Sequence, residues 1–105
     1  MKIQVNTDHN IEGTEALAER VNEVLVSALS RFSEQLTRVE VHLSEEHSHS
    51  HGKAAVRCMI EARLESRQPT AVTHVAGTVM HAVEGAADKL YRAIATTLDR
   101  LHQHR

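Results

Sequence analysis

The last third of the chain, residues 78–101, is the segment that most constrains the fold. Apolar residues recur in it at the spacing of an amphipathic helix. They are Val79, Val83, Ala86, Ala87, Leu90, Ile94, Leu98 and Leu101. The other side of this helix is polar, with Lys89, Arg92 and Arg100, so the segment is too polar to cross a membrane. Such a helix has to bury its apolar stripe against the rest of the chain.

Composition limits both the core and the kinds of partner. The chain has 105 residues, of which 41% are hydrophobic and 25% are charged, which is typical of one domain with a modest core. Aromatic residues make up only 2%, so the core is expected to be aliphatic, and recognition of bases by stacking on rings is disfavoured. The net charge is −2 with histidine neutral, so the total charge does not require a nucleic-acid partner.

Four shorter segments alternate between apolar and polar residues, as half-buried strands do. They span residues 2–7, 38–44, 56–64 and 70–76. Residues 15–32 show the helical period instead, and Thr14 is placed to cap that helix. Cys58 falls at an inward strand position and is expected to be buried. Residues 44–53 are expected to form a flexible loop, because most of them are polar and a glycine lies near the end.

The order of these elements predicts an α+β fold with the arrangement β-α-β-β-β-α. The first strand–helix–strand unit favours a right-handed parallel crossover, and the later connections are short enough for antiparallel hairpins. A four-stranded mixed sheet with two helices packed on one face would bury every apolar stripe. We expect residues 1–105 to form a single domain whose other sheet face is open to solvent or to a partner.

Three alternating histidines, His47, His49 and His51, stand out in the polar loop. In an extended segment they would lie on one side and could hold Zn²⁺, Ni²⁺ or Cu²⁺. A loop offers few partners to orient each ring, however. A metal-responsive binder and a solvated loop both remain possible at this point.

The sequence offers little for catalysis or for membrane attachment. The serines lack a nucleophile-elbow context, and there is no glycine-rich phosphate loop. No signal-like core or membrane-length apolar run is present. We therefore expect a cytoplasmic protein that is not an enzyme and has no cofactor, no small-molecule substrate and no membrane partner. The oligomeric state is left open.

Several local patterns together resemble the ribosome hibernation-promoting factor and ribosome-associated inhibitor family, also called sigma-factor modulation proteins. The chain opens with a KIQVN strand, and its first helix begins Thr14-Glu15-Ala16-Leu17. The resemblance is sharpest in residues 78–94, where the family pattern is matched by Ala82, Ala86, Asp88, Lys89, Leu90 and Arg92. The chain departs from the pattern at Thr78 and Met80, and its first helix lacks the usual lysines and arginines.

This resemblance implies a short-form, non-enzymatic translation factor. Such proteins bind rRNA of the small ribosomal subunit and inhibit translation under stress, through lysine and arginine contacts to phosphates. The motif points to Lys89 and Arg92, and Arg100 shares their face. Arg57 and Arg63 are expected to form a second patch on the open sheet face. The alternative is a regulatory protein-interaction module of the same fold that has lost strong rRNA binding, as the acidic first helix suggests.

Overall fold

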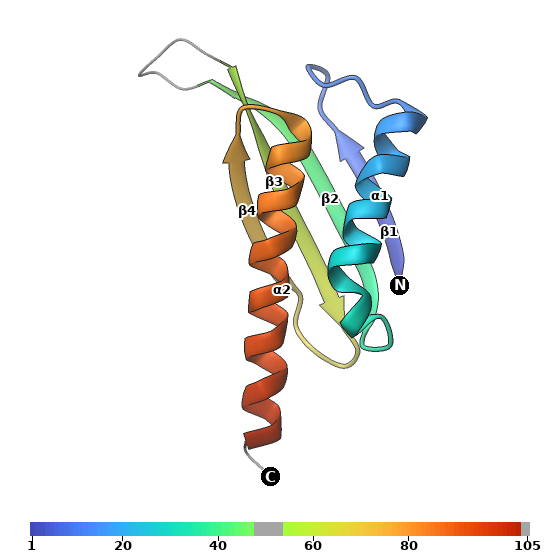
Figure 1. The fold of residues 1–105 in the computed structure, drawn as a ribbon, viewed down its shortest axis with the longest axis vertical. Coiled ribbons are helices and arrows are strands. Elements are labelled where there is room, and N and C mark those ends of the chain that lie inside the picture. The colour runs from blue at the N-terminus through green and yellow to red at the C-terminus, as the bar shows by residue number, and fades with distance from the viewer. Residues whose placement is uncertain (48–53, 104–105) are drawn as a thin grey trace.

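A computed structural model describes residues 1–47 and 54–103. Its elements follow the predicted order, with one added turn of 3₁₀ helix, η1 (Figure 1). Their bounds are β1 Lys2–Thr7, α1 Glu15–Leu29, η1 Ser30–Phe32, β2 Leu36–His47, β3 Ala54–Leu64, β4 Thr70–Ala76 and α2 Val79–Gln103.

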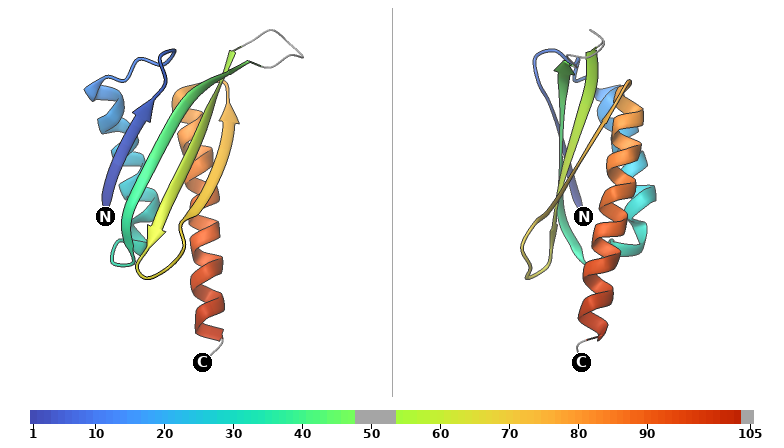
Figure 2. Two further views of the ribbon diagram at one scale, coloured as in Figure 1. Left: turned by 180° about the vertical axis from the view of Figure 1, so that it is seen from behind. Right: turned by 90° about the vertical axis from the view of Figure 1, so that its left-hand side faces the viewer.

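The strands form one four-stranded sheet in the order β1-β2-β3-β4. β1 runs parallel to β2, and β2–β3 and β3–β4 are antiparallel pairs. Both helices lie on the same face of the sheet, and the other face is uncovered (Figure 2). The predicted α+β fold with its mixed sheet is therefore confirmed.

A single aliphatic core lies between the sheet and the helices. Val41, Ile60, Leu25, Leu90 and Ile94 are completely buried in it. The buried positions of α2 are those of the predicted apolar stripe from Val83 to Ile94, together with Ala82, which the prediction did not include. Val79, Leu98 and Leu101 are only half-buried, and at the C-terminal end this is because α2 continues past the end of the sheet (Figure 1). Cys58 is buried as predicted, and burial raises the pKa of its thiol to about 12.

The helices begin where the sequence places their caps. The Thr14 hydroxyl accepts a hydrogen bond from the Leu17 amide at 3.1 Å, and the Thr78 hydroxyl accepts one from the His81 amide at 3.1 Å. Each bond satisfies an amide that has no partner within its helix. Among the described residues, neither helix is long and apolar enough to span a bilayer.

The element ends differ from the sequence expectation. β2 continues to His47 and β3 begins at Ala54, so residues 44–47 are strand and not part of the predicted loop. The extension is held by backbone pairing of Glu45 with Val56 and of His47 with Ala54, which needs no apolar side chain. The first helix ends at Leu29, and η1 takes the last predicted turn.

Candidate nucleic-acid interface

The uncovered face of the sheet carries most of its charged side chains in cross-strand rows. Strand register places Lys2 opposite Arg38 and Arg38 opposite Arg63, which we call the basic row. The next row toward the far end of the sheet places Glu40 opposite Glu61. Like charges directly opposite one another destabilise a sheet, so both rows need compensating partners.

Arg38 is compensated within the sheet. Its guanidinium donates to Gln4 Oε1 at 2.7 Å and pairs with Glu40 Oε1 at 2.8 Å. The Arg63 guanidinium is exposed and has no hydrogen bond or ion pair within residues 1–47 and 54–103. Lys2 is likewise exposed and unpaired in that part of the chain. The basic row thus keeps two cations available for an external anion.

Arg57 lies on the same open face, farther along β3. Its strand neighbours are Ser44 on β2 and Val75 on β4. It is exposed, and the described residues offer it no ion pair. The sequence prediction that Arg57 and Arg63 share the open face is consistent with this register, although the acidic row lies between them.

Two of the three basic residues proposed on α2 have internal hydrogen-bond partners. The Lys89 ammonium donates to the Thr73 carbonyl of edge strand β4 at 2.8 Å, and the Arg92 guanidinium is hydrogen-bonded to the Asp88 carboxylate one turn earlier. Arg100 is exposed, without a partner in the described part of the chain. The two residues that the family motif favours are therefore those already engaged within the molecule.

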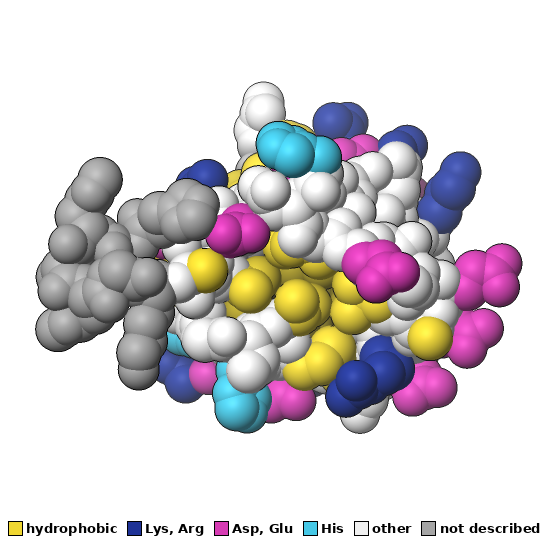
Figure 3. Space-filling view, turned by 90° about the horizontal axis from the view of Figure 1, so that it is seen from above, with side chains coloured by type: hydrophobic (Ala, Val, Ile, Leu, Met, Phe, Trp, Pro, Cys, Tyr) yellow, Lys and Arg dark blue, Asp and Glu magenta, His cyan; other side chains and the backbone are white. Residues whose placement is uncertain are grey.

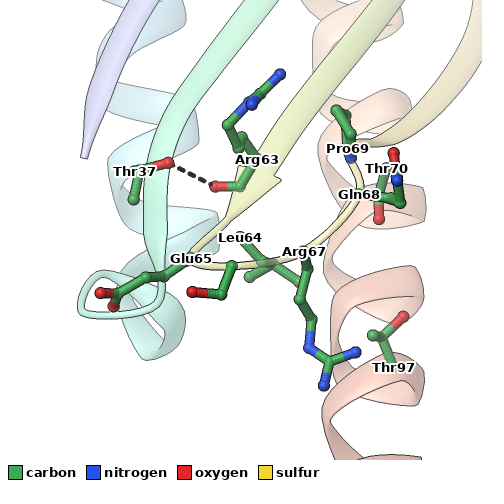
Figure 4. Close-up of a pocket in the computed structure, with 10 residues that line it drawn as sticks. Thr37, Arg63, Leu64, Glu65, Arg67, Gln68, Pro69, Thr70 and Thr97 are labelled. Atoms are coloured by element: carbon green, nitrogen blue, oxygen red, sulfur yellow. Dashed lines mark hydrogen bonds between the residues drawn. The ribbon is translucent and has the colours of Figure 1, made fainter.

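No sequence pattern singled out Arg67, which lies in the turn between β3 and β4. Ser66 before it has a φ of 60°, a left-handed conformation that is uncommon for residues other than glycine. The Arg67 amide donates to the Leu64 carbonyl at 3.1 Å, which closes the turn. The sequence signal for a site here is an arginine in a turn that contains a proline. Only the fold shows that Arg67 and Arg63 line the same hollow (Figure 4).

The outer surface of α1 is acidic. Glu15, Glu19 and Glu23 are exposed, and Arg20 is the only basic residue of that helix. This arrangement matches the expectation from the sequence. It makes α1 a poor surface for a polyanion.

The histidine cluster lies largely outside the described residues. His47 ends β2, while His49 and His51 belong to residues 48–53. Within the described residues, no group of three metal-ligating side chains comes together. The predicted metal site therefore remains a prediction.

The end of the molecule where α2 begins carries an apolar hollow of about 500 Å³. It is lined in part by Ile11, Leu17, Val56, Gly77 and Val79. Figure 3 looks onto this end and shows hydrophobic side chains gathered in the middle, with charged ones around them. Among the described residues, its lining contains Glu12 and Glu45 but no lysine or arginine.

Comparison with solved structures shows the same fold in proteins of low sequence identity. The N-terminal domain of Protein Y from Thermus thermophilus superposes with a TM-score of 0.71 at 21% identity, covering 90% of this chain and 96% of that domain. A ribosomal subunit interface protein from Coxiella burnetii gives a TM-score of 0.72 at 12% identity, covering 94% and 99%.

Comparison with curated protein sequences gave no match to this chain. The family model described as sigma 54 modulation protein / S30EA ribosomal protein, in contrast, matches residues 3–102. That match spans nearly the whole chain and confirms the resemblance seen in the first and last helices. This chain belongs to the sigma 54 modulation protein / S30EA ribosomal protein family.

Proposed function

We propose that this protein is a ribosome-associated factor of the cytoplasm that binds rRNA of the small subunit and inhibits translation under stress. The family match over residues 3–102 is the observation that carries the proposal. The protein acts by occupying a site on the ribosome and not by catalysis.

Binding rests on cationic side chains that contact rRNA phosphates, because a polyanion attracts them and releases counterions when they bind. The candidates are Arg57 and Arg63 on the open sheet face and Lys89, Arg92 and Arg100 on α2. Lys89 and Arg92 must exchange internal partners first. Both side chains are exposed, so water can replace either partner, and an exposed ion pair such as Arg92–Asp88 contributes only about 0–1 kcal/mol.

Co-sedimentation with purified ribosomes at low and moderate salt tests the proposal. We expect the protein to pellet with the small subunit at low salt and to be released progressively as salt is added. Addition of the protein to a cell-free translation system should lower the yield in the same salt range. Failure to associate with ribosomes at either salt concentration would contradict the proposal.

A second function is favoured by the acidic α1 and the net charge of −2. In that case the fold serves as a protein-interaction module without strong rRNA binding. Affinity capture from extract, with and without nuclease treatment, separates the two. Partners that disappear after nuclease treatment support rRNA binding, and partners that persist support the module.

A further inference from the structure

A hollow lies at the β3–β4 turn, where α2 runs past the end of the sheet. It has a volume of about 800 Å³ and is lined by residues of β2, β3, β4, α2 and the turn itself. Arg63, Arg67, Gln68, Thr70 and Thr97 are among them (Figure 4). We call this feature the turn hollow.

Among the described residues, the turn hollow is lined by two arginines and one acidic residue. The guanidinium groups of Arg63 and Arg67 are exposed and hold no hydrogen bond or ion pair in the described part of the chain. The hydroxyl of Thr97 is already used, because it donates to the Ala93 carbonyl at 3.0 Å. The acidic lining residue, Glu65, projects from the turn on the side away from the Arg67 guanidinium (Figure 4).

The backbone around the turn hollow is held in place. The Glu65 amide donates to the Gln35 carbonyl at 2.9 Å, and the turn is closed by the Arg67–Leu64 bond. Ser66 keeps its left-handed conformation between them, which costs an L-residue roughly 1–2 kcal/mol. Pro69 further restricts the chain at the start of β4. Arg67 is therefore presented from a constrained turn.

The basic row leads directly into the turn hollow, because Arg63 belongs to both. Its strand neighbour Arg38 is neutralised by Glu40, whereas Arg63 is not neutralised by the described residues. An RNA phosphate bound to the exposed Arg63 guanidinium would offset the cost of placing Arg63 opposite Arg38. An arginine fork matches two oxygens of a phosphate in one plane.

We propose that the turn hollow and the sheet face beside it bind the phosphate backbone of RNA, with Arg63 and Arg67 each donating to a different phosphate, because their guanidinium groups point to opposite ends of the hollow (Figure 4). This inference rests on the proposed function and names the surface that performs it. An open, polar hollow can accommodate an RNA backbone that continues beyond it in both directions. The exposed Lys2 at the far end of the basic row offers a contact for a further phosphate. The principal rRNA contact is then the turn end of the open sheet face and not the polar side of α2.

The test uses the full chain, a fluorescently labelled RNA hairpin and purified ribosomes. Arg63→Gln and Arg67→Gln should each weaken hairpin binding about tenfold and lower the slope of log affinity against log salt by about one. Arg20→Gln is the matched control, because Arg20 is also an exposed arginine without a partner in the described residues, but lies on acidic α1. It should leave the affinity within about twofold, since it makes no phosphate contact.

A second pair of variants guards against a loss of folding. Arg63→Lys and Arg67→Lys keep the charge but not the fork, so they should retain the salt slope while losing part of the affinity. Urea unfolding of each lysine variant should coincide with that of the wild type, since the charge is kept and neither side chain has an internal partner in the described part of the chain.

The outcomes separate the inference from the proposed function. If the wild type pellets with ribosomes and the glutamine variants do so equally well, the inference is wrong and the proposed function stands. If Arg20→Gln weakens hairpin binding as much as Arg67→Gln does, or if the hollow prefers a polyglutamate peptide to RNA, the inference is also wrong. If the wild type binds neither hairpin nor ribosome, both fail.

Discussion

At the scale of single residues, the glycine at position 85 is explained by one neighbouring side chain. Gly85 lies in the interior of α2, where glycine costs about 1 kcal/mol relative to alanine. A methyl group there would collide with the ring of His74, which β4 places on the helix-covered face. The imidazole occupies the space of the missing side chain, so the glycine is retained for close approach of helix and strand.

Gly85→Ala should therefore destabilise the fold by about 1–2 kcal/mol, because the ring of His74 has to move or the helix has to shift. In a His74→Ala background the same change should become neutral or stabilising by up to about 1 kcal/mol, since helix propensity then dominates. Urea unfolding of the four proteins of this double-mutant cycle measures the coupling. Additive effects of the two substitutions would show that the ring and the glycine do not interact.

At the scale of elements, the β1–α1 loop is fastened to β2 by one carboxylate. Asp8 Oδ2 accepts a hydrogen bond from the Glu45 amide at 3.0 Å, and Asp8 Oδ1 accepts one from the Asn10 amide at 3.0 Å. The Asp8 backbone amide continues the parallel pairing by donating to the Leu43 carbonyl at 3.0 Å. The carboxylate thus sets where the chain leaves β1 and starts toward α1.

These contacts make stability depend on pH in a defined direction. The Glu45 amide, and more weakly the Asn10 amide, hold the pKa of Asp8 below its ordinary value of 3.8. Because the pKa is lower in the folded state, the stabilisation is present above pH 3.8 and is lost as the pH falls through the folded value. Asp8→Asn should lower the urea midpoint at pH 7, and the difference from the wild type should shrink below pH 3.8. A difference of the same size at pH 7 and at pH 2.5 would contradict this.

At the scale of the whole molecule, all the elements share one core. It takes buried residues from both helices, from η1 and from the central strands β2 and β3, and hydrophobic residues of β1 and β4 pack against it. Phe32 of η1 and Tyr91 of α2 join the two helical segments at 5.2 Å between ring centroids, and Arg31 donates to the Tyr91 hydroxyl at 3.1 Å. A core of this kind is expected to open cooperatively.

Cys58 provides a probe of that cooperativity. It is completely buried on the central strand β3, and burial raises its thiol pKa to about 12, so the reactive thiolate is scarce and shielded in the folded protein. Labelling with a thiol reagent near pH 8 should be limited by unfolding. The labelling rate gives a free energy for exposing Cys58, and this value should equal the free energy of global unfolding measured by urea titration. Rapid labelling under native conditions would show that β3 opens locally.

The candidate site was only partly predictable from the chain. Arg57 and Arg63 were assigned to the open face because strand alternation is a local property. Lys89 and Arg92 were favoured by a motif, but their contacts with Thr73 and Asp88 depend on side-chain and strand positions that the motif does not encode. Arg67 was missed because a turn residue has no periodicity to mark its direction.

By itself the sequence determined the type and order of the elements, the α+β class, the apolar stripe of α2 and the helix starts at Thr14 and Thr78. These follow from periodicity and capping, which act over a few neighbouring residues. Only the tertiary structure decided how far β2 and β3 extend, why residue 85 is glycine, and which basic side chains have no partner among the described residues. Those depend on backbone pairing and on contacts between residues far apart in the chain, which no local pattern specifies.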